Sequence, residues 1–164
     1  MLNIIEFKKI NILGVRVSNV NMNIVLNNIK YWIKSDQKHY ICVRDIHGVV
    51  QCQKNQFLME IHNNSGMVIP DGMPLVWVGR LFGFKKICRV TGPDLMDRLC
   101  QQSQKEGYTH FLYGGSNEVP QKLKEKLKKK FPLINIVGTY SPPFRELKPK
   151  EIAREISEKM KLDI

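Results

Sequence analysis

Apolar positions along the chain follow two alternating patterns, one typical of strands and one typical of helices. Short apolar runs bounded by turn residues, such as MVIP at 67–70, are typical of buried strands. Other segments repeat apolar residues every three or four positions, which is typical of amphipathic helices. Predicted strands cover residues 10–17 (a pair hinged at Gly14), 39–46, 67–70, 108–115 and 134–140. Predicted helices cover residues 21–34, 49–63, 74–82, 93–105, 117–131 and 150–161.

Strands and helices that take turns indicate an α/β fold with a mostly parallel sheet and helices on both faces, in a Rossmann-like arrangement. Neither an internal repeat nor a low-complexity linker interrupts the pattern, so a single domain over 1–164 is expected. In such sheets ligands bind beyond the carboxyl ends of the strands. We therefore expect the functional residues where each predicted strand ends.

The bulk composition narrows the classes of partner. The chain has 26 Lys and Arg against 15 Asp and Glu, a net charge of +11, which favours nucleic acid, phosphorylated ligands or an anionic membrane surface. The cysteines Cys42, Cys52, Cys88 and Cys100 have no C-x-x-C or zinc-ligand spacing, which indicates free thiols. No segment resembles a signal peptide or a membrane span. We expect a cytoplasmic protein with at most peripheral membrane contact.

Asp71 is the most unusual acid, because it interrupts the apolar run MVIPDGMPLVW between Pro70 and Gly72. An Asp in P-D-G is a common turn residue, since its side chain bonds nearby backbone. A carboxylate at the mouth of a buried strand can instead act as a general base. The pattern alone leaves both interpretations open.

Other strand ends carry further candidates, each with a plain structural alternative. His47 at the end of 39–46 suits a structural histidine or a ligand contact. Arg89 stands outside any charge run and could hold a diphosphate through two hydrogen bonds. Gly114 and Gly115 suit either a tight turn capped by Ser116 or a phosphate-binding loop before a helix.

The predicted helix 117–131 is rich in lysine. A solvated face is the plain interpretation, and attraction to anionic lipid or nucleic acid is the alternative. The helix has no interleaved aromatic residues of the RNA-binding kind, which argues against nucleic acid. The chain has no Asp-x-Asp, so neither a metal–diphosphate clamp nor another cofactor is expected.

Several segments, in order, resemble the bacterial WecG/TagA/CpsF glycosyltransferases. They are INILGVRVSNV, VIPDGMPLVWVGRLFG, RVTGPDLMDRLC, GYTHFLYGGSNEVPQKLKEKLKKKFP and IVGTYSPPFREL, within 10–158. The resemblance implies an inverting hexosyltransferase on the cytoplasmic face of the membrane. It would move a sugar, N-acetylmannosamine in the best-known branches, from a UDP-sugar to a polyprenyl-diphosphate-linked acceptor. The products are wall teichoic acid, enterobacterial common antigen, capsule and exopolysaccharide.

The resemblance also assigns residues. The family's general base corresponds to Asp71, and the arginine of its R-V-x-G-x-D motif corresponds to Arg89. The substrate-binding set expected here is Asp45, His47, Arg89, Thr91, Gly92, Asp94, Tyr113, Gly114 and Gly115, with no metal ligand. Many members carry T-x-N-A where this chain reads ICVRDIH, although a V-H-G-V branch matches Ile46–Val49 better.

Family members usually continue for some tens of residues beyond the length of this chain, so we expect it to lack the family's C-terminal part. An exposed sheet edge would then favour self-association, and a homo-oligomer is an expected partner state. Two other functions stay open: a non-catalytic nucleotide- or anion-binding module on the same fold, and a basic nucleic-acid binder.

Overall fold

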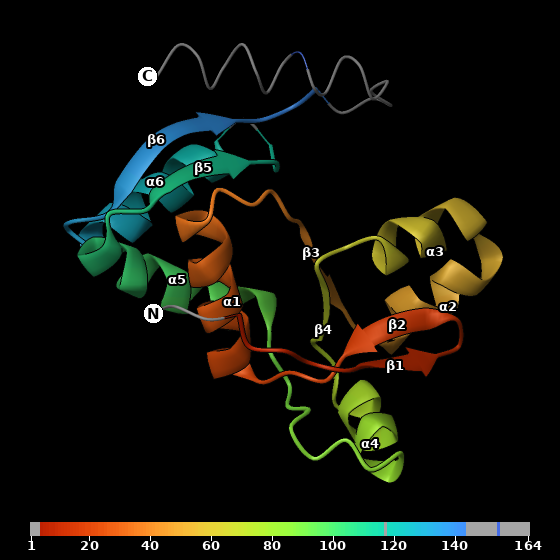
Figure 1. Ribbon diagram of the computed structural model, residues 1–164. Helices are drawn as coiled ribbons and strands as arrows, with labels where there is room; N and C mark the ends of the chain where they lie inside the picture. Colours follow the sequence, from red (N-terminus) through yellow and green to blue (C-terminus); the bar gives the residue numbers. More distant parts are fainter. Residues whose placement is uncertain (1–3, 117, 144–153, 155–164) are drawn as a thin grey trace. The chain divides into compact units, whose positions relative to one another are not determined.

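The computed structural model describes residues 4–116, 118–143 and 154 (Figure 1). The chain divides into two compact units, Met1–Met96 and Asp97–Ile164, and each is described by itself. Strands and helices alternate as predicted. The elements of the described residues are β1 (Lys9–Ile12), β2 (Val15–Ser18), α1 (Met22–Lys34), β3 (Ile41–Arg44), α2 (Ile46–Lys54), α3 (Gln56–Asn63), β4 (Met67–Pro70), α4 (Met73–Leu81), α5 (Gly92–Glu106), β5 (Thr109–Tyr113), α6 (Val119–Lys130) and β6 (Asn135–Tyr140).

The strands β1 and β2 form the antiparallel hairpin expected around Gly14. Leu13 (φ 50°) and Gly14 (φ 83°) both lie in the left-handed region, which is the geometry of a two-residue hairpin turn. The Asn11 side chain accepts a hydrogen bond from the Gly14 N–H at 2.8 Å. The turn therefore follows from the local sequence.

The strands β3 and β4 pair in parallel, from Ile41 opposite Met67 to Arg44 opposite Pro70. Every residue of β4 is buried, as in a strand covered on both faces. The Ser18 hydroxyl of β2 accepts from the Val68 N–H of β4 at 3.1 Å. The hairpin is thus joined to the parallel pair by a side chain.

Two predictions in this region were wrong in detail. The single helix predicted over 49–63 is two helices, α2 and α3. Asn55 adopts an extended backbone (φ −141°, ψ 98°), and its side chain accepts from the Leu58 N–H at 3.0 Å. The strand predicted over 39–46 ends at Arg44, because Asp45 caps α2. In both places a short polar side chain starts a new helix.

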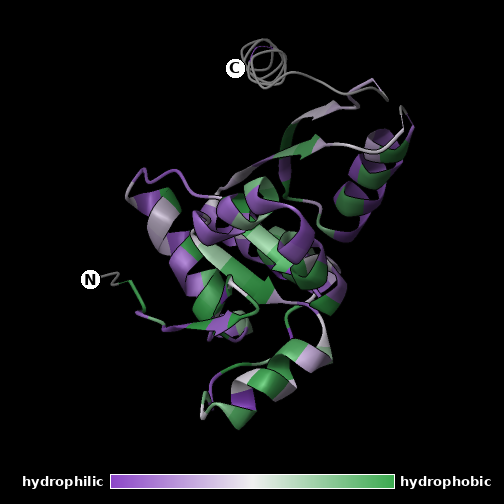
Figure 2. Cartoon of the chain, turned by 90° about the vertical axis from the view of Figure 1, so that its right-hand side faces the viewer, coloured by the Kyte–Doolittle hydropathy of each residue, from purple (hydrophilic) through white to green (hydrophobic). Residues whose placement is uncertain are grey.

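Helix α4 begins one residue before the predicted proline and ends before Gly83, whose φ is +81°. Its ribbon is mostly hydrophobic in colour (Figure 2). The buried residues Leu75, Val76 and Gly79 face the core. A Cβ on Gly79 would lie 2.8 Å from the Ile87 side chain and 3.1 Å from that of Ile10, so glycine sets the closeness of this contact.

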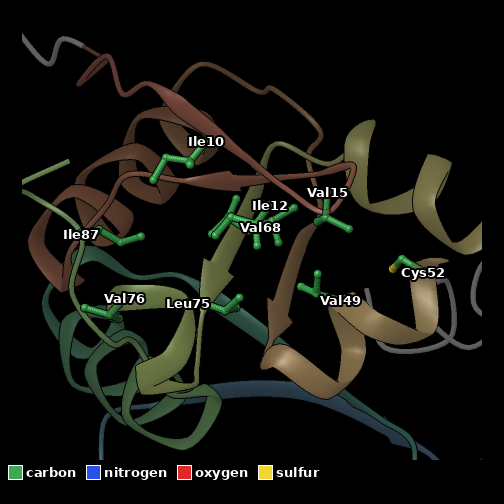
Figure 3. Packing of buried hydrophobic residues seen from close by; sticks show 10 residues of the cluster. Ile10, Ile12, Val15, Val49, Cys52, Val68, Leu75, Val76 and Ile87 are labelled. Carbon is green, nitrogen blue, oxygen red and sulfur yellow. The ribbon is translucent and has the colours of Figure 1, made fainter. Parts of the chain in front are cut away.

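The core of the first unit joins β1, β2, α2, β4, α4 and the buried Ile87 (Figure 3). Val68 of β4, Ile12 of β1 and Leu75 of α4 belong to the same cluster. The core thus fixes β4 between the hairpin and α4.

In the second unit β5 and β6 pair in parallel, with an irregularity between His110 and Phe111. Leu127, Phe131 and Ile136 share its core cluster. The helix predicted from 117 begins at Val119, and no side chain caps it. Instead the Ser116 carbonyl accepts from the Val119 N–H at 2.9 Å. The predicted helix 150–161 lies, apart from Arg154, outside the described residues.

Candidate active site

The carboxyl ends of β3 and β4 meet at one edge of the sheet, because the two strands pair in register up to Arg44 and Pro70. The Asp71 N–H donates to the Arg44 carbonyl at 2.8 Å. A Cβ on Gly72 would lie only 3.5 Å from the Cα of Asp45. The loops that carry Asp45 and Asp71 therefore touch.

Arg89 makes two contacts with Asp71. Its Nε–H donates to the Asp71 carbonyl, and its guanidinium lies 3.6 Å from Asp71 Oδ1. The Val90 N–H donates to the Pro70 carbonyl at 2.9 Å, and the neighbouring Ile87 is fully buried. The family resemblance assigns both Asp71 and Arg89 to the site, and the structure places the two residues in contact.

Both side chains of this pair reach solvent: 33% of the Asp71 side chain and 53% of the Arg89 side chain are exposed. The carboxylate is thus accessible to a molecule that approaches the strand ends. The Arg89 guanidinium has more N–H donors than its contacts with Asp71 use. Its planar geometry allows it to bind a diphosphate through two hydrogen bonds. The pair combines a proton acceptor with a receptor for negative charge.

Asp45 caps α2, because its carboxylate accepts from the Gly48 N–H at 2.8 Å. His47 is exposed on the same helix, and its Nε2 lies 3.1 Å from Nε2 of Gln51, one turn along. Both residues lie at the expected strand end. Their contacts within the chain are those of helix residues, so a substrate contact stays a prediction.

Thr91, Gly92 and Asp94 start α5. The Thr91 hydroxyl accepts from the Asp94 N–H at 3.1 Å, and a Cβ on Gly92 would lie 3.8 Å from the Val43 side chain of β3. The first turn of α5 therefore faces the strand that leads to Asp45. Backbone N–H groups at a helix start favour anions, which is consistent with the predicted substrate contact.

Tyr113, Gly114 and Gly115 belong to the second unit. Gly114 (φ 112°) and Gly115 (φ 75°) adopt backbone conformations that favour glycine. The Gly114 N–H already donates to the Tyr140 carbonyl at 2.9 Å, and the Tyr113 and Tyr140 rings lie 5.9 Å apart. The structure explains this turn locally. Its contribution to a donor site stays a prediction.

The sequence interpretation missed a buried polar cluster behind the strand ends. His62 of α3 is fully buried. Its Nδ1 lies 2.6 Å from the Leu58 carbonyl, and its Nε2 accepts from Nε of Arg44. These partners assign the proton to Nδ1. No local pattern in the sequence marks this histidine as buried, because its partners are a backbone carbonyl and an arginine 18 positions away.

Cys52 lies against the same histidine, with Sγ 3.6 Å from His62 Nδ1. A cysteine beside a histidine suggests a nucleophile. Burial, however, raises the pKa of the Cys52 thiol, and the nearby Arg44 opposes this only in part. The buried thiol therefore stays protonated, and the cluster serves to hold Arg44 at the end of β3.

Residues 4–116, 118–143 and 154 hold neither a metal-binding cluster nor a membrane-spanning helix. No cluster of three His, Cys, Asp or Glu side chains in these ranges is arranged to hold a metal ion. Nor is any helix in the described part of the chain both long enough and apolar enough to cross a bilayer.

Comparison with known proteins agrees with the order of motifs in the chain. The model of the family described as "Glycosyl transferase WecG/TagA/CpsF family" matches residues 10–161. A relative from Bacillus subtilis (strain 168) is 28% identical over 146 residues, which cover 82% of this chain and 56% of the relative. A relative from Staphylococcus aureus (strain NCTC 8325 / PS 47) is 24% identical over 150 residues, which cover 90% and 58%.

Both relatives are named N-acetylglucosaminyldiphosphoundecaprenol N-acetyl-beta-D-mannosaminyltransferase. The chain spans little more than half the length of these two relatives.

Proposed function

Because the chain belongs to the WecG/TagA/CpsF family of glycosyltransferases, we propose that it is an inverting hexosyltransferase. The donor is a UDP-sugar of the N-acetylmannosamine type or another hexose, and the acceptor is a sugar linked to a polyprenyl diphosphate. The names of the relatives support both choices. The contact of Asp71 with Arg89 is the single observation that carries the proposal.

In this mechanism Asp71 is the general base. Its carboxylate takes the proton of an acceptor hydroxyl while that oxygen forms a bond to the anomeric carbon of the donor. The bond from the anomeric carbon to the diphosphate breaks, and UDP leaves with the electron pair. A single displacement inverts the anomeric centre, as it does in sugar hydrolysis.

Arg89 receives the charge that develops on the departing diphosphate. Its hydrogen bond to the Asp71 carbonyl holds this cation beside the base. The start of α5, with Thr91, Gly92 and Asp94, supplies further polar groups for the donor. Asp45 and His47 contribute from the neighbouring strand end. For Tyr113, Gly114 and Gly115 the predicted contact with the donor rests on the sequence alone.

The wider setting belongs to the same proposal. The enzyme acts from the inner face of the cell membrane in the synthesis of teichoic acid, capsule or exopolysaccharide. The alternating strands and helices and the parallel strand pairs support the α/β class of a Rossmann-like glycosyltransferase core, and the chain can form a homo-oligomer.

A second function, a non-catalytic nucleotide-binding module, is favoured by one observation. Asp45 and Asp71 both have structural partners, the Gly48 N–H and Arg89, as turn and capping residues would. A nucleic-acid binder is less well supported, because Lys122 and Lys130 of the lysine-rich α6 already pair with Glu118 and Asp97.

A transfer assay separates these functions. The chain is mixed with UDP-N-acetylmannosamine and a polyprenyl-diphosphate-linked N-acetylglucosamine, and both UDP release and the lipid product are measured. The proposal expects both to form. Binding of the UDP-sugar without turnover indicates the binding module, and failure of both binding and turnover overturns both functions.

A further inference from the structure

Helix α4 presents apolar side chains to solvent on the face opposite its buried one. Leu75, Val76 and Gly79 point into the core. Trp77 is 58% exposed, Leu81 86%, and the adjoining Phe82 67%. Trp77 and Leu81 are four residues apart and thus lie on one helical face. Phe82 extends the apolar surface beyond the end of the helix.

Such an arrangement differs from the scattered apolar residues found on most protein surfaces. Leu133 (75% exposed), in the turn between α6 and β6, is an example of the scattered kind. Phe57 (70% exposed) has only Ile61, at 36%, as an exposed apolar neighbour in α3. Three large side chains within six residues form a continuous patch, and such patches mark contact surfaces.

Positive charge surrounds the patch. Arg80 lies on α4 between Trp77 and Leu81, and the exposed Lys85 and Lys86 follow Phe82 after a short turn. Among the residues that the structure describes, these three cations form no ion pair. An apolar helix face with Trp, Leu and Phe, bordered by Lys and Arg, is typical of segments that lie in a membrane interface.

A cavity of about 630 Å³ opens beside the patch. Phe7, Phe82 and Phe84 supply apolar walls, Lys8, Lys85 and Lys86 supply cations, and Glu6 is the acidic residue of the lining. Asn19 also lines it, and its Oδ1 is buried without a hydrogen-bond partner among the described residues. Cations and an unused acceptor suit a phosphate that carries a hydroxyl group.

We propose that Trp77, Arg80, Leu81, Phe82, Lys85 and Lys86, here called the α4 surface, dock the protein on an anionic bilayer. Trp77, Leu81 and Phe82 lie among the acyl chains just below the headgroups. Arg80, Lys85 and Lys86 contact lipid phosphates, and the cavity accepts one headgroup with a free hydroxyl, as in phosphatidylglycerol. The charges of the surface favour a lipid partner over a second copy of this chain, which has a net charge of +11.

This inference goes beyond the proposed function. The two are compatible, because a lipid-linked acceptor would lie in the bilayer on which the protein docks. Its test measures binding and not transfer. If the protein binds vesicles but does not transfer sugar, the inference holds and the proposed function fails. If it transfers sugar but does not bind vesicles, the proposed function holds and the inference fails.

The experiment is sedimentation of the full chain with vesicles of phosphatidylcholine, with and without phosphatidylglycerol as the anionic lipid. We expect binding only to the anionic vesicles. The variant with Leu81→Ser and Phe82→Ser should bind at least about tenfold more weakly, and the variant with Lys85→Glu and Lys86→Glu at least about 30-fold more weakly.

Matched controls change the same residue types elsewhere. Phe57→Ser removes an exposed phenylalanine of α3, and Lys128→Glu with Lys129→Glu reverses two exposed lysines of α6. Each should bind vesicles as the unchanged chain does. Equal loss in the α6 variant means that net charge alone drives binding, and this overturns the inference.

Trp77 also reports its own surroundings. The other tryptophan, Trp32, is 7% exposed, so a blue shift on adding anionic vesicles comes from Trp77 and should vanish in Trp77→Phe. A shift that depends on protein concentration without vesicles indicates self-association instead. An emission already blue-shifted without vesicles at every concentration indicates that the chain itself covers the surface. Either result overturns the proposal.

Discussion

Arg89 holds Asp71 by both its backbone and its side chain: Nε–H donates to the Asp71 carbonyl, and the guanidinium lies 3.6 Å from Oδ1. The carboxylate that the proposed reaction uses as a base thus lies beside the cation that it uses for the leaving group. The pair lies just beyond the buried strand β4, so both groups are held without closing them off from solvent.

Asp71→Asn should remove transfer and leave donor binding nearly unchanged. The amide has almost the same shape, but it cannot take a proton, and general-base catalysis contributes about 10²–10⁴-fold. Turnover and the Kd for the UDP-sugar are measured on the same preparation. Turnover at a near-original rate would show that Asp71 is a turn residue only.

Arg89→Lys should weaken donor binding by about tenfold or more, although the charge is kept. The lysine ammonium lacks the planar set of N–H donors with which a guanidinium can bind the Asp71 carbonyl and a diphosphate at the same time. Calorimetric titration with UDP provides the measurement, with the exposed Lys54→Ala as a control. Unchanged UDP affinity in Arg89→Lys would assign the guanidinium to the fold alone.

Asp45 can be tested for a role beyond its cap. Asp45→Ala should lower the free energy of unfolding by about 1 kcal/mol, because the Gly48 N–H loses its acceptor. Asp45→Ser keeps an N-cap oxygen and should restore most of that stability. If Asp45 also binds substrate, the serine variant stays stable but has a raised KM. An unchanged KM in Asp45→Ser would show that Asp45 serves only as the N-cap of α2.

His62→Phe should be among the most destabilising changes in the first unit, by about 2–4 kcal/mol. It leaves the Arg44 guanidinium and the Leu58 carbonyl without the partners that the imidazole provides. His62→Gln keeps one donor and one acceptor and should lose less. Urea unfolding measures both, with the exposed His47→Ala as a control. Equal stability of all three variants would contradict the assigned cluster.

The stability of the second unit should fall below about pH 6.5. Burial lowers the pKa of His110 from 6.5, and its Nε2 has no hydrogen-bond partner among the described residues. Between the folded and unfolded pKa values the unfolded chain binds more protons, so this part of the stability is present above pH 6.5 and lost as the pH falls.

His110→Gln cannot bind that proton, so its unfolding free energy should decline less between pH 7.5 and pH 5.5 than that of the unchanged chain. His47→Gln, at an exposed position, should not change the decline. Urea unfolding at the two pH values is the measurement. An identical pH dependence in His110→Gln would contradict the assignment.

The sequence predicted much of the fold because local signals and burial agreed there. The hairpin at Gly14 needs a left-handed turn, and the sequence supplies Asn11, Leu13 and Gly14 for it. The buried run 67–70 is β4 as predicted. Apolar periodicity failed at Asn55, because it cannot register a polar side chain that caps a new helix within an amphipathic segment.

The candidate site was predicted only in part, for a similar reason. Parallel pairing placed Asp45 and Asp71 at one sheet edge, and motif order connected Arg89 with them. The Arg44–His62 contact joins residues 18 positions apart, and no local pattern distinguishes a buried histidine from an exposed one. The apolar positions of α4 showed a helix but not which of its faces stays uncovered.

The register of β3 and β4 has a consequence for engineering. The two strands end level, and the hydrogen bond from the Asp71 N–H to the Arg44 carbonyl ties the acid to the last residue of β3. Side chains alternate along a strand, so one inserted residue in β4 would turn the acid to the opposite face and move it by about 3.3 Å. Chimeras with longer relatives should therefore join the chains within loops and leave the length of this strand unaltered.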